Sequence, residues 1–369
     1  MSLVKQNEIE QRMDLTVVSI ADPDAENTSH RYSHTRFLFI PKSIRIVDIL
    51  YHYWQAAWKR LFSNSHIIAS LFYRQVLHAI RKDQYDAVVF EGGESYGFKA
   101  YDKIFHGKLW YHVHANPEKP VNSAYFNDVM VLSNYVLHNW RTQCIDHTQH
   151  LHVLHNGIDT SLFRQAITPQ ENASLREQYG FQPDDFIVLY CGRLFSGKGV
   201  KELTQAVASI QDPSVKLLIV GYAHDTDARR YQNELEAIAE TTHGRVKITG
   251  YIPNEDVFRF YHAANIQVVP SLWEEGAGNI CIEGMAAGLP IIATRSGGMP
   301  EYLSSECSIL VDRGDAMVKD IATQILELKN NPEKCQRMAQ FAQKHAEKFS
   351  ENAYYSSYVD LLEKKEEFQ

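Results

Sequence analysis

The sequence predicts an α/β protein in which parallel sheets are flanked by helices. Short β-branched runs alternate with segments of helical periodicity from one end of the chain to the other, as in repeated strand–helix–strand units. The strand runs are almost wholly apolar, as expected of strands that are covered on both faces. A length of 369 residues allows two ordinary domains of this class.

Twelve runs are expected to form strands, six in each half of the chain. These runs are 15–20, 36–40, 85–90, 109–113, 129–132, 151–154, 186–190, 215–220, 246–249, 266–270, 290–293 and 308–311. Helices are expected between them where apolar residues recur at positions i, i+3, i+4 and i+7. Three such faces are those of Leu203, Ala206, Val207 and Ile210, of Val257, Phe260, Tyr261 and Ala264, and of Val318, Ile321, Ala322 and Ile325.

The boundary between the two domains is expected after His155, where a strand run ends in the turn sequence HNGID and a polar stretch follows. We therefore expect a first Rossmann-like domain at 1–155 and a second at 156–348. Residues 349–369 are expected to form a last helix. This helix is a candidate for packing back on the first domain, although the sequence leaves its partner open.

Composition and charge exclude several classes of protein. The chain carries 37 lysine and arginine residues against 45 aspartate and glutamate residues, a formal net charge of −8. Nucleic-acid-binding proteins usually have a basic surplus, so no nucleic-acid partner is expected. The five cysteines form no C-x-x-C pair and indicate reduced thiols in a cytoplasmic protein. The first residues are unlike a secretory signal, and no apolar run has the length needed to cross a bilayer.

One segment, residues 43–62, has two interpretations. It repeats apolar and aromatic side chains at helical spacing and carries Arg45, Lys59 and Arg60. A membrane-surface helix has this pattern, and so does a helix that packs into the core of the first domain. Inward packing is favoured, while peripheral contact with the inner face of a membrane stays open.

The densest functional signal is the segment 270–301, PSLWEEGAGNICIEGMAAGLPIIATRSGGMPE. A strand run is followed by a loop with two glutamates and two glycines, and then by the start of a helix. Gly276 and Gly278 allow the backbone to approach a ligand closely, and the free N–H groups of a helix start favour phosphate or hydroxyl oxygens. Glu275 and Glu283 are expected to point into one crevice beyond the strand ends, where two carboxylates suit vicinal hydroxyls. The structural alternative is one capping glutamate and one solvated glutamate.

A second signal follows the strand run at 186–190, where the chain reads YCGRLFSGKG. Arg193 and Lys198 bring two positive charges to a helix N-terminus, which suits a diphosphate. The stretch imitates a Walker A loop, but Gly199 stands where the hydroxyl that holds Mg²⁺ would be, so a P-loop ATPase fits poorly. An exposed turn lysine is the structural alternative for Lys198.

Three blocks resemble the retaining family-4 (group 1) glycosyltransferases of the GT-B fold in order and spacing. They are HNGID at 155–159, GRLxxxKG at 192–199 and EGAGxxxxEGMAAGLP at 275–290, with supporting pieces at 218–221, 250–256 and 296–301. The resemblance covers about 151–301 and is similar to bacterial polysaccharide and spore-coat glycosyltransferases. It implies two Rossmann-like parallel-sheet domains facing a central cleft.

The resemblance implies a role for each matching residue. Arg193 and Lys198 would hold the donor diphosphate and neutralise the charge that grows as it leaves, which is usually the largest catalytic contribution. Glu275 would contact the donor sugar and Glu283 the ribose hydroxyls. No resident cofactor and no metal are implied, because the two cations replace Mg²⁺. Further contacts to the nucleotide-sugar donor are implied for Gly221, Tyr251, Gly276, Ala277, Gly278, Asn279 and Ile280.

Enzymes of this family also place a histidine at a strand end of the first domain, beside the reacting centre. The sequence YHVH, which ends in His114, matches this feature, and its second histidine is favoured because it lies nearer the C-terminal end of the strand. A hydrogen-bonded structural histidine is the alternative. His147, His150, His152 and His155 also gather, but they lack a cysteine or carboxylate pattern for zinc and are interpreted as incidental.

Two departures from the family pattern stand out. Family members open with a strand, a glycine-rich loop and a helix, whereas the first strand run here, 15–20, is followed by Ala-Asp-Pro-Asp. The first domain is therefore expected to lack its opening strand and glycine loop, through a truncated sequence or a misplaced start. The phenylalanine common after the first glutamate's glycine is Ala277 here, as in some lipopolysaccharide transferases.

The resemblance implies a retaining hexosyl- or N-acetylhexosaminyltransferase that uses a UDP- or GDP-linked sugar. The expected acceptor is a cell-surface glycan, a lipid-linked molecule or a protein. A different class stays open, a catalytically weak nucleotide-sugar-binding coat or scaffold protein, which the missing glycine loop favours. A GT-B sugar-nucleotide epimerase, which would release nucleotide without an acceptor, is the least favoured interpretation.

Overall fold

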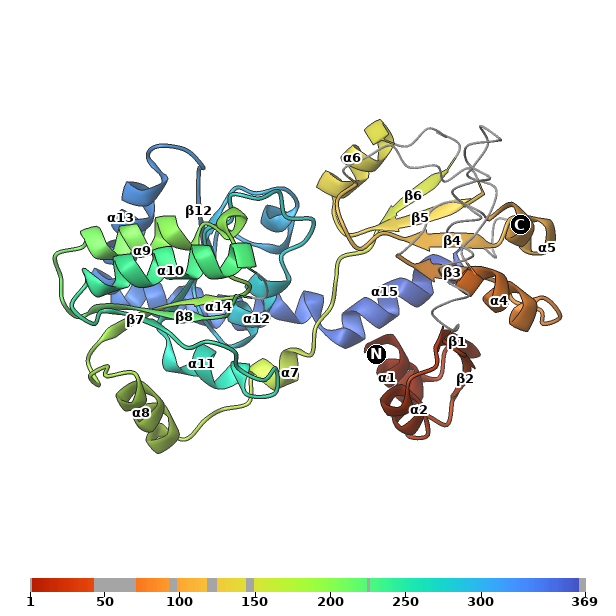
Figure 1. The fold of residues 1–369 in the computed structure, drawn as a ribbon, viewed down its shortest axis with the longest axis horizontal. Coiled ribbons are helices and arrows are strands. Elements are labelled where there is room, and N and C mark those ends of the chain that lie inside the picture. The colour runs from red at the N-terminus through yellow and green to blue at the C-terminus, as the bar shows by residue number, and fades with distance from the viewer. Residues whose placement is uncertain are drawn as a thin grey trace. The chain divides into compact units, whose positions relative to one another are not determined.

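The computed structural model describes residues 2–42, 71–92, 98–117, 125–143, 149–223 and 226–364. The chain divides into two compact units, one of Met1–His155 with Tyr354–Gln369 and one of Asn156–Ala353 (Figure 1). The amphipathic segment expected at 43–62 lies outside the described residues. In the described ranges, no helix combines the length and the apolar character that crossing a membrane would require.

The described part of the first unit contains two parallel sheets. The smaller pairs β1 (Leu15–Ile20) with β2 (Thr35–Ile40), and the larger has the order β3 (Val88–Glu91), β4 (Leu109–His112), β5 (Asp128–Val131) and β6 (His150–Val153). The helices are α1 (Ser2–Glu10), α2 (Pro23–Ser29), α4 (Leu71–Ile80), α5 (Lys99–Phe105) and α6 (Asn134–Gln143).

Aromatic side chains fill the core of the first unit. The Phe90 ring on β3 lies edge-on to Phe98 and Tyr101, with centroid distances of 4.5 and 5.1 Å. All three side chains are buried, and edge-to-face contacts of this kind add to the free energy gained by burial. This core holds β3 and β4 in place. β3 ends at Glu91, and β4 ends at His112, two residues before the predicted His114.

The last helix, α15 (Glu351–Glu363), contributes its residues from Tyr354 onward to the first unit. Tyr358 forms one buried cluster with Trp110 of β4, Met130 of β5 and Leu154 after β6. Burial of large apolar side chains is the main source of stability, so this helix is part of the first unit's core.

The second unit has one six-stranded parallel sheet. Its strands, in spatial order, are β12 (Ser308–Val311), β11 (Ile291–Thr294), β10 (Ile266–Val269), β7 (Phe186–Cys191), β8 (Val215–Val220) and β9 (Val246–Ile248). Its helices are α7 (Thr160–Phe163), α8 (Pro169–Gln178), α9 (Val200–Ser209), α10 (Thr226–Glu240), α11 (Val257–Ala263), α12 (Asn279–Ala286), α13 (Met317–Asn330) and α14 (Pro332–Ala346), with short 3₁₀ turns η2 (Ser196–Lys198), η3 (Met299–Tyr302) and η4 (Glu347–Phe349).

Helices cover both faces of this sheet, because side chains of each strand alternate between two cores. On β7, Leu189 enters the core lined by α11, α12 and α14, whereas Val188 and Tyr190 enter the core lined by α9, α10 and α13. Strands buried on both faces are expected to be apolar throughout, and the sequence FIVLYC of β7 fits that requirement.

The strand order creates a switch point between β7 and β10. From β7 the chain adds β8 and β9 on one side, and it then returns to place β10 on the other side. In open parallel sheets, ligands bind beyond the carboxyl ends of the strands at such a point. The loops that follow β7 and β10 are therefore the part of the second unit where a ligand is expected.

All twelve predicted strands are present, and their ends agree with the prediction within one residue, except at the start of β3. The run 85–90 was expected to be a strand, but pairing begins only at Val88, opposite Leu109 at the start of β4. The carbonyl of Tyr85 accepts instead from the Lys108 side chain at 2.7 Å. The strand thus begins where its partner strand begins.

Candidate functional site

Backbone contacts join the two loops at the switch point of the second unit. The carbonyl of Gly197 accepts hydrogen bonds from the amides of Leu272 and Trp273 at 2.9 and 2.8 Å. Gly199 has a φ of +66°, and a Cβ atom there would lie 1.9 Å from the carbonyl oxygen of Pro270. Only glycine fits this conformation and this spacing. The loop after β7 is thus pressed against the loop after β10.

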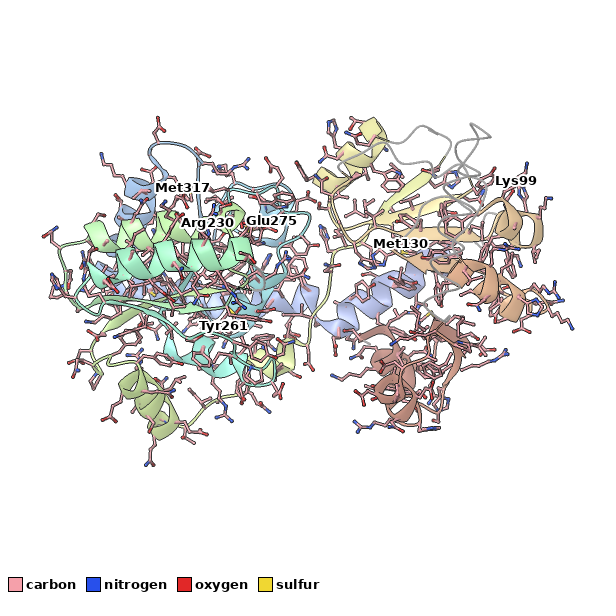
Figure 2. The ribbon with its side chains drawn as sticks, viewed as in Figure 1. Lys99, Met130, Arg230, Tyr261, Glu275 and Met317 are labelled. Atoms are coloured by element: carbon pink, nitrogen blue, oxygen red, sulfur yellow. The ribbon has the colours of Figure 1, made fainter. Side chains whose placement is uncertain are left out.

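This contact brings Lys198 to Glu275. Glu275 is labelled in Figure 2. Lys198 Nζ donates to Glu275 Oε1 at 2.6 Å, and the Ser271 hydroxyl donates to the same oxygen at 2.6 Å. The two charged side chains are only 20% and 17% exposed. A charge-assisted bond of this kind is stronger when water is largely excluded. The pair therefore fixes both groups in one place at the strand ends.

Arg193 stands on the same loop as Lys198. Both cations lie near the ring of Phe195, with Arg193 Cζ 5.4 Å and Lys198 Nζ 5.7 Å from its centroid. Buried Tyr190, at the end of β7, donates its hydroxyl to the Arg193 carbonyl at 2.8 Å and so fixes the start of the loop. The Arg193 side chain itself is exposed and is available to an anionic ligand.

Glu283 is held differently. It lies on α12, and its Oε2 accepts a hydrogen bond from the Tyr261 hydroxyl of α11 at 2.6 Å. Burial raises the pKa of Glu283 to about 7, although the bond from Tyr261 acts in the opposite direction. Burial also raises the pKa of the neighbouring Cys191 thiol to about 12, so this cysteine is neutral and no nucleophile near pH 7.

The loop from Gly276 to Ile280 leads into α12, whose first amides have no carbonyl in a preceding turn to bond. Gly278 packs tightly, since a Cβ atom there would lie 3.0 Å from Tyr302 Cβ and would require a shift of that side chain. Asn279 accepts from the Asn156 side chain at 3.0 Å through its Oδ1. Ala277 packs against the core, so the path of the loop is fixed. The loop therefore presents the backbone N–H groups of the helix start in fixed positions.

Two further predicted residues lie beyond β8 and β9. A Cβ atom on Gly221 would lie 2.1 Å from the Gly192 carbonyl oxygen, so glycine is required where this strand end meets the loop after β7. Gly221 also forms a bridge with Gly250, the residue before Tyr251. The Tyr251 side chain is 63% exposed and stands edge-on to Tyr222 at 5.0 Å.

The second unit thus brings the predicted Lys198 and Glu275 into direct contact, with Arg193 on the same loop. Glu283 is within electrostatic range of the buried Cys281 thiol, as are Glu275 and Lys198. Tyr261 and Ser271 were missed as polar partners. Tyr261 was assigned only to the apolar face of its helix, since the periodicity that predicts a helix does not show what a buried hydroxyl contacts.

The first unit contains a separate cluster at the ends of β3 and β4. His112 Nδ1 and His114 Nε2 lie 2.8 and 2.9 Å from the same oxygen of Glu91, Oε2. The Tyr358 hydroxyl of α15 donates to the other oxygen, Oε1, at 3.2 Å. Burial by itself raises the pKa of Glu91, but the hydrogen bonds from the two histidines outweigh it and hold the pKa below its usual value.

Glu91 was not predicted, although it directly follows the run assigned as a strand. It stands opposite His112 in the parallel register of β3 and β4. Among the described residues, the ligand atoms of Glu91, His112 and His114 lie within 4.8 Å of one another, a donor set that could hold a divalent cation. That no metal takes part stays a prediction.

The interpretation of the other histidines needs a correction. They were taken to lack a carboxylate, but Asp128, the first residue of β5, lies 3.4 Å from His150 and 3.0 Å from His152. Asp128 and His150 are register partners in neighbouring strands, and the Asp128 side chain is 2% exposed. A buried carboxylate requires such partners, so these two histidines have a structural role. His147 lies outside the described residues.

This chain matches a family model, curated relatives and solved structures. Residues 171–345 match the family model of the glycosyl transferases group 1. A putative glycosyltransferase, EpsD of Bacillus subtilis, is 33% identical over 224 residues, which are 58% of this chain and 56% of that protein. The lipopolysaccharide 1,2-N-acetylglucosaminetransferase of Salmonella typhimurium is 28% identical over 271 residues, 69% of this chain and 68% of that protein. The chain spans about half the length of most curated relatives it matches.

Among solved structures, the Anabaena protein HepE in complex with UDP and glucose has a TM-score of 0.73. The superposition covers 98% of this chain and 95% of that chain at 19% sequence identity. A likeness at this identity shows the fold. Residues 171–345 therefore resemble the group 1 glycosyl transferases, and the chain has the GT-B fold.

Proposed function

We propose that this protein transfers a sugar from a UDP- or GDP-linked donor to an acceptor hydroxyl, with retention of configuration. In this proposal Arg193 and Lys198 hold the diphosphate, Glu275 contacts the donor sugar and Glu283 binds the ribose hydroxyls. His114 of the first unit contacts a substrate hydroxyl beside the reacting carbon. The acceptor is a cell-surface glycan, a lipid-linked molecule or a protein, and the reaction takes place in the cytoplasm without a metal.

The observation that carries the proposal is the contact between Lys198 and Glu275 at the switch point. A lysine ammonium fixed beside a carboxylate can serve two adjacent parts of one ligand, an anionic phosphate and a neutral hydroxyl. As the bond between sugar and phosphate breaks, negative charge grows on the diphosphate. Two cations already in place stabilise that charge without reorganisation, which lowers the barrier.

The pKa of Glu283 supports its proposed partner. A ribose brings two neutral hydroxyl donors, which an ionised carboxylate accepts best. Because burial raises the pKa of Glu283 to about 7, its ionisation is incomplete near neutral pH in the free protein. Donor binding would then favour the ionised form, so donor affinity is expected to rise between pH 6 and 8.

The first experiment is a thermal-shift screen of the full chain against UDP, GDP, UDP-glucose, UDP-N-acetylglucosamine and GDP-mannose. A ligand that binds only the native state raises the melting temperature, and at equal concentration the tighter ligand raises it more. The nucleotide sugar that gives the largest shift is then used in a transfer assay with glycan and lipid-linked acceptors.

The second experiment tests the residues. Lys198→Ala and Glu275→Ala are expected to abolish transfer while the circular dichroism spectrum is retained. Matched controls come from the exposed pair of Lys201 and Glu234, whose Nζ–Oε2 distance is 2.9 Å. Lys201→Ala and Glu234→Ala are expected to retain wild-type turnover, because an exposed pair contributes little.

Turnover of Lys198→Ala or Glu275→Ala at the wild-type rate would refute the proposal. Donor binding by the wild-type chain without transfer to any acceptor would favour a nucleotide-sugar-binding coat or scaffold protein. Release of free nucleotide at the full rate without an acceptor would favour an epimerase.

A further inference from the structure

We infer that Glu91 is a positioning residue, which fixes the His114 ring so that its neutral form presents Nδ1 as a hydrogen-bond acceptor to a substrate hydroxyl. The substrate part of this inference rests on the proposed function. The protein part rests on the cluster of Glu91, His112, His114 and Tyr358 in the first unit.

The ring protons follow from the hydrogen bonds. An ionised carboxylate only accepts, so each nitrogen that faces Glu91 Oε2 must carry a hydrogen. His112 therefore donates from Nδ1 over 2.8 Å and His114 donates from Nε2 over 2.9 Å. In a neutral imidazole the other nitrogen is then an acceptor. For His114 that acceptor is Nδ1.

His112 supports this assignment. Its side chain is fully buried, and its Nε2 has no hydrogen-bond partner within the part of the chain that the structure describes. A charged His112 would bury an unpartnered N–H group, which is costly, whereas a neutral ring leaves only a lone pair there. His112 is therefore a neutral Nδ1–H donor, and it occupies one of the acceptor positions of Oε2.

The orientation of the His114 ring is fixed on one edge. A Cβ atom on Gly92 would lie 3.1 Å from His114 Cδ2, the carbon next to Nε2. The Nε2–Cδ2 edge thus faces Glu91 and Gly92, while the ring as a whole remains 47% exposed. The opposite edge, which carries Nδ1, is the one left for a ligand.

Glu91 is itself held from its other oxygen. Tyr358 is buried, and burial raises its pKa well above the usual value, so its hydroxyl keeps its proton and donates to Oε1. The carboxylate therefore receives bonds on both oxygens. Because Tyr358 holds Glu91 and Glu91 holds His114, the His114 ring loses little conformational entropy when a substrate binds.

The test is proton NMR of the full chain in water at pH 8, with histidine labelled with ¹⁵N in the ring. Imidazole N–H protons are visible when a strong acceptor protects them from exchange. Two protected protons are expected from this cluster, one on Nδ1 of His112 and one on Nε2 of His114, in addition to those of histidines with other acceptors, such as His152 beside Asp128. His114→Asn assigns the second. Glu91→Ala should remove both, whereas Glu91→Gln should retain them because a carbonyl acceptor remains.

Kinetics gives a second readout. With the donor that the thermal-shift screen selects, Glu91→Ala is expected to lower kcat roughly 10- to 100-fold. The KM for the donor should stay within about twofold, because the proposed donor residues are all in the second unit. Glu91→Gln should retain most of the activity. Glu8→Ala is the matched control, since Glu8 is an exposed carboxylate of the same unit that accepts from Ser33 and His34.

Persistence of the His112 and His114 protons in Glu91→Ala, or their absence from the wild-type chain, would overturn the inference. So would their loss on addition of one equivalent of Zn²⁺, because the cluster would then bind a metal through these nitrogens. Unchanged kcat in Glu91→Ala would contradict the proposed contact of His114 with the substrate, even if NMR confirms that Glu91 fixes the ring protons. A wild-type chain that transfers no sugar would instead contradict the proposed function and leave the NMR test intact.

Discussion

Replacing Glu283 by glutamine should change how the stability of the second unit depends on pH. In the wild type the Tyr261 hydroxyl donates to the Glu283 carboxylate at 2.6 Å. Glutamine keeps an oxygen that can accept this hydrogen bond, but it cannot ionise. The wild-type carboxyl has a pKa of about 7 in the folded protein, against 4.5 for an ordinary glutamate. The variant therefore removes one titration and little else.

The sign of the effect follows from proton binding. Because the folded state holds the proton more tightly than the unfolded state, the wild type loses stability as pH rises from about 4.5 to about 7. At 1.36 kcal/mol per pH unit, the loss amounts to about 3 kcal/mol. The stability of Glu283→Gln relative to wild type should thus increase by about 3 kcal/mol between pH 4.5 and pH 7.5.

Urea denaturation at several pH values, followed by tryptophan fluorescence, measures this difference. For a unit of about 200 residues, each kcal/mol also moves the melting temperature by about 2–4 °C, so calorimetry gives an independent reading. Parallel stability curves for wild type and variant over this pH range would refute the argument. They would mean that Glu283 has an ordinary pKa and is not desolvated.

Two further predictions concern stability. Gly199→Ala should destabilise the protein by several kcal/mol, because the new Cβ would lie 1.9 Å from the Pro270 carbonyl oxygen. Gly180→Ala is the control: its φ is +74° but no atom lies within 4 Å of the new Cβ, so it should cost only about 1–2 kcal/mol. Equal losses of stability in urea denaturation would contradict the close approach at Gly199. Arg12→Ala should destabilise only slightly, because its partners Asp360 and Glu363 are about half exposed, and 1 M salt should remove most of that difference.

The strands could be predicted from sequence because most are short apolar runs, and those of the second unit's sheet are largely buried on both faces. The contact between the loops was not predicted: Gly276 and Gly278 were expected to let a ligand approach, whereas the close approach of Pro270 to Gly199 is found only in the structure. Lys198 and Glu275 lie 77 positions apart, and their contact follows from the switch point once β7 and β10 are neighbours. Two of the three blocks that indicate the family, at 192–199 and 275–290, begin on these two loops, whereas HNGID at 155–159 lies elsewhere.

Glu91 and Asp128 could not be found in the same way. Each acts on histidines more than 20 positions away, through the register of neighbouring parallel strands. A shift of one residue in that register would turn the side chains to the other face, and an apolar run does not determine it to that accuracy. The hydroxyl donors Tyr261 and Ser271 could not be predicted either, because a tyrosine also fits an apolar core and a serine also fits a turn.

The return of the chain to its first unit has a consequence for synthesis. Trp110 and Met130 are complete early in translation, but Tyr358, which covers them, follows only after the whole of Asn156–Ala353 has been made. On the ribosome the first unit must therefore wait with an uncovered apolar surface until its final helix emerges. Chaperone capture of the nascent chain is expected to centre on that surface and to end with release of the finished polypeptide.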